Sequence, residues 1–173
     1  MDNWFMRNLS VIKAVLRVVF GAFWLADGIL KFQPGLVDAF PDMVRSAAAG
    51  QPQWLSGWFS FWAGVTSSNP ALFVYSTGAL EVVLGLALVL GILRKISYTA
   101  SFFLALVIWS VPEGFGGPYG PGSTDIGTGI VYSLASLLFL TINAAFGPSR
   151  YSVDFAIERS FPAWKRFAEV RGD

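Results

Sequence analysis

The chain has 173 residues, of which 54% are hydrophobic and 13% are charged, and its formal net charge is +1. A soluble domain is about 45–50% apolar and about 25% charged, so we expect one domain whose apolar excess faces lipid, with no electrostatic basis for nucleic-acid binding. Cysteine and histidine are absent, which excludes disulfides, Cys/His zinc sites, thiolate iron–sulfur clusters, His-ligated haem and Ser–His–Asp catalysis.

Four apolar segments are candidate membrane-spanning helices, because a span needs about 20 residues with few charges. They cover residues 14–33, 71–93, 95–112 and 125–146. The first segment is the least apolar, since it contains Arg17, Asp27 and Lys31. Arg17 and Lys31 lie near its ends, where long side chains can extend to the membrane surface, so only Asp27 is deep. The sequence therefore predicts an all-α integral membrane protein with a four-helix bundle over residues 1–148.

The charges in the loops predict how these helices are oriented. Basic residues precede the first segment, separate the second from the third, and follow the fourth. The positive-inside rule therefore predicts a multi-pass protein of the plasma membrane with both termini in the cytoplasm.

Two further segments lie outside the predicted spans. The connection over 33–70 carries large apolar residues about one helical turn apart, namely Trp54, Leu55, Trp58, Phe59 and Trp62. Two interpretations are equally open: a helix at the outer membrane surface, or a lid packed on the mouth of the bundle. The tail over 149–173 mixes basic and aromatic residues, which is typical of a cytoplasmic amphipathic helix, here broken at Pro162, or of a docking segment for a partner.

Charged residues inside the predicted bundle are the strongest functional signal, because an ionisable side chain in hydrocarbon must be neutral, paired or hydrated. At 100° per residue, one face of the first segment carries Arg17, Gly21, Trp24, Gly28 and Lys31. We expect this face to point into the bundle, with its two glycines allowing close approach of a neighbouring helix.

Five charged residues from three segments are predicted to meet in the outer half of the bundle. They are Asp27, Lys31, Glu81, Glu113 and Asp125. Four are acidic and one is basic, so at least one carboxyl group is neutral, or Arg17 or a bound cation balances the charge. Such a cluster can bind a small polar ligand or relay protons; the alternative is an ion-pair network that only orients the helices.

The loop PEGFGGPYGPGST over 112–124 is rich in glycine but lacks the lysine of a P-loop and the spacing of a dinucleotide-binding motif. The Ser123-Thr124-Asp125 segment after its glycines can offer backbone N–H groups to a small anion at a helix N-terminus, unless Asp125 itself caps the helix. Tyr119 and Tyr132 can add hydrogen-bond donors to the same region.

Three stretches carry a family resemblance: LRVVFGAFWLADGILKFQPG, GALEVVLGLALVLGILRK and EGFGGPYGPGSTDIGTGIVY. They resemble the DoxX/DoxD superfamily, and most closely the DoxD-like small subunit of thiosulfate:quinone oxidoreductase. The resemblance extends over roughly residues 14–146. It implies a four-helix membrane protein that works with a second subunit, oxidises thiosulfate to tetrathionate and passes the electrons to quinone.

The motifs of this family carry over to Arg17, Trp24, Asp27, Lys31, Glu81, Glu113 and Asp125. We predict that Glu81 and Asp27 are the catalytic residues, which handle protons. The predicted substrate-binding residues are Arg17, Trp24, Lys31, Glu113, Tyr119 and Asp125. Because the chain offers no residues for a redox centre, we expect no metal ion and no covalently bound cofactor. We expect instead a quinone or small-anion ligand in the bilayer, and a second redox subunit or a second copy of the chain as partner.

Two other functions stay open at this point. The chain can be a non-enzymatic transport protein in which the polar cluster conducts protons or a small solute. It can also be a membrane scaffold whose basic, aromatic tail recruits a redox partner.

Overall fold

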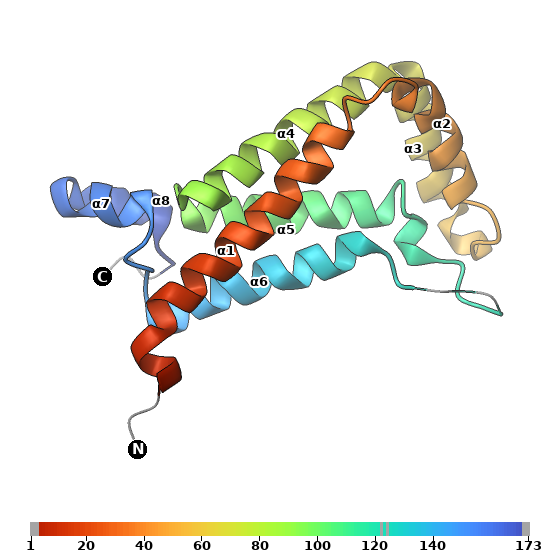
Figure 1. Cartoon of the computed structure of the whole chain (residues 1–173). Helices are drawn as coiled ribbons and strands as arrows, with labels where there is room; N and C mark the ends of the chain where they lie inside the picture. Colours follow the sequence, from red (N-terminus) through yellow and green to blue (C-terminus); the bar gives the residue numbers. More distant parts are fainter. Residues whose placement is uncertain (1–3, 122, 124, 171–173) are drawn as a thin grey trace.

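The computed structural model describes residues 4–121, 123 and 125–170, and every regular element in these ranges is helical (Figure 1). The α-helices are α1 (Trp4–Leu30), α2 (Leu36–Ala47), α3 (Ser56–Ser68), α4 (Pro70–Leu90), α5 (Arg94–Ser110), α6 (Thr128–Phe146), α7 (Val153–Ser160) and α8 (Lys165–Ala168). Short 3-10 turns cover Gln53–Leu55, Gly114–Gly116 and Pro162–Trp164. The prediction of an all-α fold is confirmed.

Four long helices form the body of the molecule. α1 packs along α4, α5 packs along α6, and α4 contacts α5 to join the two pairs. In Figure 1, α2 and α3 lie at one end of this body, and α7 and α8 lie at the opposite end. Between the two ends, the core is formed by Phe20, Trp24, Leu88, Tyr98 and Ala105.

Three of the helices are long and apolar enough to cross a membrane. They cover Met6–Leu30, Pro70–Leu90 and Thr128–Phe146. Only 22–28% of the most apolar stretch of each is buried inside the molecule, so most of its apolar side chains face outward, as lipid contact requires. The segment predicted as a further span over 95–112 is α5, which has 17 residues and is shorter than the usual span of about 20 residues.

Glycines set the close contact between α1 and α4. A Cβ atom added at Gly21 would lie 2.9 Å from the Gly85 carbonyl oxygen, and one added at Gly28 would lie 2.9 Å from the Gly78 carbonyl oxygen. Real Cβ atoms do not approach other heavy atoms this closely, so only glycine fits. As the spacing predicts, Arg17, Gly21, Trp24 and Gly28 are all buried along this face of α1.

The α2–α3 hairpin packs on the mouth of the bundle, which supports the lid interpretation of this segment. The Trp58 indole N–H donates a hydrogen bond of 3.0 Å to the Ser110 carbonyl at the end of α5. Gln51, between the two helices, donates to the Gly114 carbonyl at 2.7 Å. Phe59 is buried, whereas Trp54 is 81% exposed, so the predicted aromatic stripe divides into an inward and an outward part.

Candidate functional site

A polar cavity of about 170 Å³ lies among α1, α4, α5 and α6, close to the end that carries the α2–α3 hairpin. Besides Thr128, six residues with polar groups line it, namely Trp24, Asp27, Lys31, Glu81, Glu113 and Tyr132. Five of these six were predicted from the sequence as catalytic or substrate-binding residues, and Tyr132 was predicted as an additional donor. The cavity is large enough for a single ring, because a cavity of about 150 Å³ holds benzene.

Glu81 is the most deeply buried charged residue of the cavity, with 1% of its surface exposed. Its Oε2 atom lies 3.2 Å from Lys31 Nζ, and it accepts no well-aligned hydrogen bond from the described residues. A buried carboxylate is normally surrounded by several donors. Glu81 therefore has one cationic neighbour and unused capacity to bind a donor.

Carboxyl groups outnumber the basic groups of this cavity. Asp27, Glu81 and Glu113 line it together with the single ammonium of Lys31. The Asp27 carboxyl also interacts with the Tyr132 hydroxyl and with Glu81. If all three carboxyl groups were ionised, the cavity would hold an excess of negative charge, so the arrangement favours holding a proton or binding a hydrogen-bond donor.

The side chain of Glu113, which follows α5, caps the N-terminus of α6. Its Oε2 atom accepts a hydrogen bond of 2.9 Å from the Gly129 backbone N–H. Burial raises the pKa of Glu113, and this hydrogen bond partly opposes the increase. A carboxylate of the chain itself thus occupies a backbone donor at the N-terminus of α6, a few residues beyond the Ser123-Thr124-Asp125 segment in which the sequence predicted anion binding. Thr124, part of the predicted anion-binding turn, lies outside the described residues.

Trp24 contributes an unused hydrogen-bond donor. The side chain is 1% exposed, and its indole N–H donates to no acceptor among the described residues. Leaving a buried N–H unpaired costs about 1–3 kcal/mol, unless water or a ligand accepts the bond. The sequence singled out Trp24, but it gave no sign of this free donor.

Three predicted residues do not line the polar cavity. Arg17 lies ten residues before Asp27, which is about 15 Å along the helix, and it donates to the Tyr151 carbonyl at 2.8 Å. Tyr119 is 61% exposed, and its hydroxyl donates to the Phe115 carbonyl. Asp125 is exposed and accepts from the Gly127 N–H at 2.8 Å. The expected cluster therefore forms without Asp125 and without the compensating charge of Arg17.

The sequence reasoning missed a second charged group, which we call the Arg94 cluster. Arg94, at the start of α5, is 1% exposed and forms ion pairs with Asp154, Glu158 and Glu169 of the C-terminal segment. The distances are 3.2 Å to Asp154 and 2.9 Å to Glu158, and the Glu169 contact is very short. In the sequence, Arg94 is one of the basic loop residues and its three partners are acidic residues of the tail. Only the folded structure shows that they contact one another.

The carboxylates of the Arg94 cluster also hold the start of α5. Asp154 accepts hydrogen bonds from the backbone N–H groups of Leu93 and Arg94, at 2.8 and 2.9 Å. It also accepts one from the Trp164 indole at 2.7 Å. Burial raises the pKa of Glu169 to about 7, with Arg94 opposing the increase and Glu158 adding to it. The cluster thus fastens the C-terminal segment to the bundle.

An aromatic layer separates the polar cavity from the Arg94 cluster. Phe20, Trp24, Tyr132, Phe139 and Tyr98 pack in ring contacts with centroids 5.3–6.3 Å apart. The cavity beside Arg94 has a volume of only about 10 Å³, less than a water molecule normally needs. The polar cavity is therefore closed on this side.

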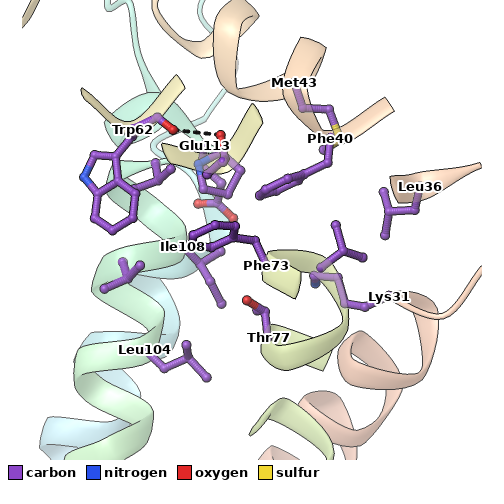
Figure 2. Close-up of a pocket in the computed structure, with 15 residues that line it drawn as sticks. Lys31, Leu36, Phe40, Met43, Trp62, Phe73, Thr77, Leu104, Ile108 and Glu113 are labelled. Carbon is purple, nitrogen blue, oxygen red and sulfur yellow. Dashed lines mark hydrogen bonds between the residues drawn. The ribbon is translucent and has the colours of Figure 1, made fainter. Parts of the chain in front are cut away.

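A second, apolar cavity of about 220 Å³ adjoins the polar one beneath the α2–α3 hairpin. Figure 2 shows Phe40 and Met43 of α2 on one side of this space, with Phe73 of α4 and Ile108 of α5 facing it. Lys31, Ile108 and Glu113 line both cavities. The two spaces therefore meet at one ammonium and one carboxyl group.

Comparison with known families tests the resemblance seen in the sequence. A family model described as DoxX matches residues 12–112, more than half of the chain. The chain belongs to the DoxX family. The DoxX match runs from within α1 to the end of α5, so it includes Trp24, Asp27, Lys31 and Glu81 and stops one residue before Glu113. No curated protein and no solved structure matches this DoxX chain.

Proposed function

We propose that this DoxX protein is a membrane subunit of a quinone-linked oxidoreductase, whose substrates are thiosulfate and quinone. Its polar cavity binds the quinone ring or a small anion, and its carboxyl groups handle protons. The observation that carries the proposal is the meeting of Asp27, Lys31, Glu81 and Glu113 around a space the size of one ring.

The chemistry of quinone reduction matches the groups in the cavity. A quinone takes up two electrons and two protons to become a quinol, and two thiosulfates supply two electrons when they join to form tetrathionate. In our proposal a second subunit, or a second copy of the chain, delivers the electrons. Glu81 and Asp27 pass protons to the ring oxygens, and Lys31 and the Trp24 indole N–H bind those oxygens.

The closed inner side of the cavity favours a binding pocket over a path through the membrane. A transport protein needs access to its site from both sides, yet the aromatic layer and the tightly packed Arg94 cluster lie on the inner side. We therefore prefer the oxidoreductase subunit to the transport alternative.

The membrane arrangement in our proposal has four spans, with α5 as the fourth. α5 lies beside α6, and a helix of 17 residues is about 25 Å long, close to the hydrocarbon thickness of about 30 Å. The distribution of basic loop residues supports cytoplasmic termini in the plasma membrane. The polar cavity then lies in the outer half of the membrane.

Assaying the purified chain by itself tests the proposed division of labour. The chain alone should bind quinone but should not reduce it when thiosulfate is added, because it has no residues for an electron-carrying centre. Full thiosulfate-dependent quinone reduction by the chain alone would refute the role of a second subunit.

Ring binding is tested with a benzoquinone that has no tail, titrated into the purified chain and followed by quenching of tryptophan fluorescence. Lys31→Met should weaken binding about tenfold, the effect of losing one charge-assisted hydrogen bond. Lys165→Met is the matched control, since Lys165 is exposed on α8 at the other end of the molecule. Equal affinities of both variants and the parent chain would contradict the proposed site.

A further inference from the structure

The apolar cavity has no role in binding a polar ring or an anion. Its walls come from four helices, with Phe40 and Met43 on α2, Trp62 on α3, Phe73 on α4, and Leu104 on α5. A small anion gains nothing from such walls, because they offer it few hydrogen bonds. The space of about 220 Å³ is instead large enough for several hydrocarbon groups.

The two cavities adjoin and together form one path with a polar and an apolar half. They share Lys31, Ile108 and Glu113, which therefore lie at the junction. The apolar cavity also shares Lys31, Leu36 and Met43 with an open groove over the turn between α1 and α2, so Lys31 borders all three spaces. The path thus runs from the buried Glu81, past Lys31, to an opening beside this turn.

The polar half is built to receive the head of a ligand. It holds the unpaired Trp24 indole N–H and the one-sided Glu81–Lys31 ion pair. Trp62, which lines the apolar half, also has a buried indole N–H without an acceptor among the described residues. A molecule with a polar ring and one apolar chain satisfies both halves of the path at once.

We infer that the apolar cavity holds the hydrocarbon tail of a single-chain amphiphile whose polar ring occupies the polar cavity, and that this ligand is a prenylated quinone. The inference rests on the proposed function and adds to it, because it makes the substrate a membrane-resident, tail-bearing quinone rather than a water-soluble one. The ligand enters with its ring first, between α2 and the end of α1, and the α2–α3 hairpin covers its tail.

The test compares benzoquinones with the same ring and zero, one or two isoprenoid units, titrated into the full chain in detergent. In the parent chain, the first unit should tighten binding about tenfold or more, because it removes several carbons from water. Leu104→Trp fills the apolar cavity and should abolish this gain while leaving the affinity of the tail-less ring unchanged. Each probe partitions into detergent to the same extent with either chain, so the ratio of its affinities for the variant and the parent chain is free of this effect.

Two further variants keep the test decisive. Phe103→Trp is the matched control, since Phe103 is 60% exposed and does not line the cavity, and it should retain the full gain from the tail. Met43→Trp narrows the cavity from its open side, where Met43 is 43% exposed, so it replaces Leu104→Trp if that variant does not fold.

The outcomes separate the inference from the proposed function. If the filled variants keep the full gain from the tail, the tail binds elsewhere and the inference is overturned, while the ring site stands. If a single-chain phospholipid displaces the ring-bearing probes as well as a prenylated quinone does, the occupant is a lipid and the inference is also overturned. If the parent chain binds no quinone, with or without a tail, the proposed function itself fails.

Discussion

The polar cavity and the Arg94 cluster both surround one basic residue with three carboxyl groups, yet they are built differently. The Arg94 guanidinium contacts Asp154, Glu158 and Glu169 directly, and about 10 Å³ of free space remains beside it. Among the residues that the structure describes, Lys31 forms an ion pair with Glu81 alone, next to a cavity of about 170 Å³.

This difference separates a structural charge cluster from a candidate binding site. Arg94 Nε and Glu81 Oε2 each have an ion-pair partner at 3.2 Å and no well-aligned hydrogen bond among the described residues, so free space is what distinguishes the two regions. The closely packed charges of the Arg94 cluster leave no room for a ligand and hold segments together. Glu81 Oε2 and the Trp24 indole N–H lie beside open space, where a ligand can reach them. Substitutions in the two regions test whether they differ in this way.

Removing the guanidinium of the Arg94 cluster should have the largest effect. Arg94→Met leaves three buried carboxyl groups facing one another, so it should cost about 3–5 kcal/mol of unfolding free energy. The C-terminal segment should detach, which trypsin cleavage after Lys165 and Arg166 would report.

An exposed ion pair supplies the control for this variant. Arg45 pairs with Asp42 at 2.5 Å, but their side chains are 58% and 77% exposed. Arg45→Met should therefore change the unfolding free energy by less than about 1 kcal/mol. Equal effects of Arg94→Met and Arg45→Met would show that the cluster does not hold the tail.

The α1–α4 contact connects the two regions, and a methyl group added to it should have the next largest effect. A Cβ atom at Gly85 would lie 2.7 Å from the Leu25 backbone nitrogen, so Gly85→Ala should cost about 1–3 kcal/mol. Gly64, in α3, has nothing within 4 Å of such an atom. Gly64→Ala should instead be neutral or stabilising, by up to about 1 kcal/mol. Thermal unfolding in detergent compares the two, and equal changes would contradict close packing at Gly85.

Neutralising Glu81 in the polar cavity should lower the unfolding free energy less than Arg94→Met or Gly85→Ala does. Glu81→Gln keeps the shape of the side chain, and Lys31, whose side chain is 29% exposed, can still reach water. We expect a change in unfolding free energy of less than about 1.5 kcal/mol, because removing a buried charge offsets the lost ion pair. Chemical unfolding measures this change, and a loss as large as that of Arg94→Met would make Glu81 a structural residue.

The last prediction concerns the pH dependence of tail docking. Burial raises the pKa of Glu169 from its ordinary value of 4.5 to about 7, so the docked segment binds this proton more tightly than the free segment does. Docking is then strongest below pH 4.5 and weakens as the pH rises to 7. Hydrogen exchange of α7, corrected for the intrinsic rate, should show this trend. Glu169→Gln should remove this pH dependence of exchange. An unchanged pH dependence in that variant would mean that another group causes it.

Periodicity predicted the part of the site that lies along single helices. Trp24, Gly28 and Lys31 share a helical face, and α1 must bury that face because charged residues on it avoid lipid. Glu81 follows from the same reasoning on α4. These inferences need only the geometry of one helix and the cost of a charge in hydrocarbon.

Contacts between distant segments were beyond such reasoning. Nothing in the local sequence pairs Arg94 with residues 60 to 75 positions later, or places Glu113 instead of Asp125 at the first turn of α6. Periodicity places Arg17 on the same helical face as Lys31, although much of the length of α1 separates the two residues. Tertiary packing decides these positions, whereas periodicity shows only on which face of its helix a residue lies.

Photolabelling tests the central claim, that the polar cavity is a ligand site, most directly. The intact chain is labelled with an azido-benzoquinone carrying one isoprenoid unit, and the modified peptides are mapped by mass spectrometry. We expect adducts at Trp24, Lys31 or Tyr132 that unlabelled quinone suppresses. Adducts confined to lipid-facing residues such as Val83 and Leu138, without suppression by unlabelled quinone, would contradict the account.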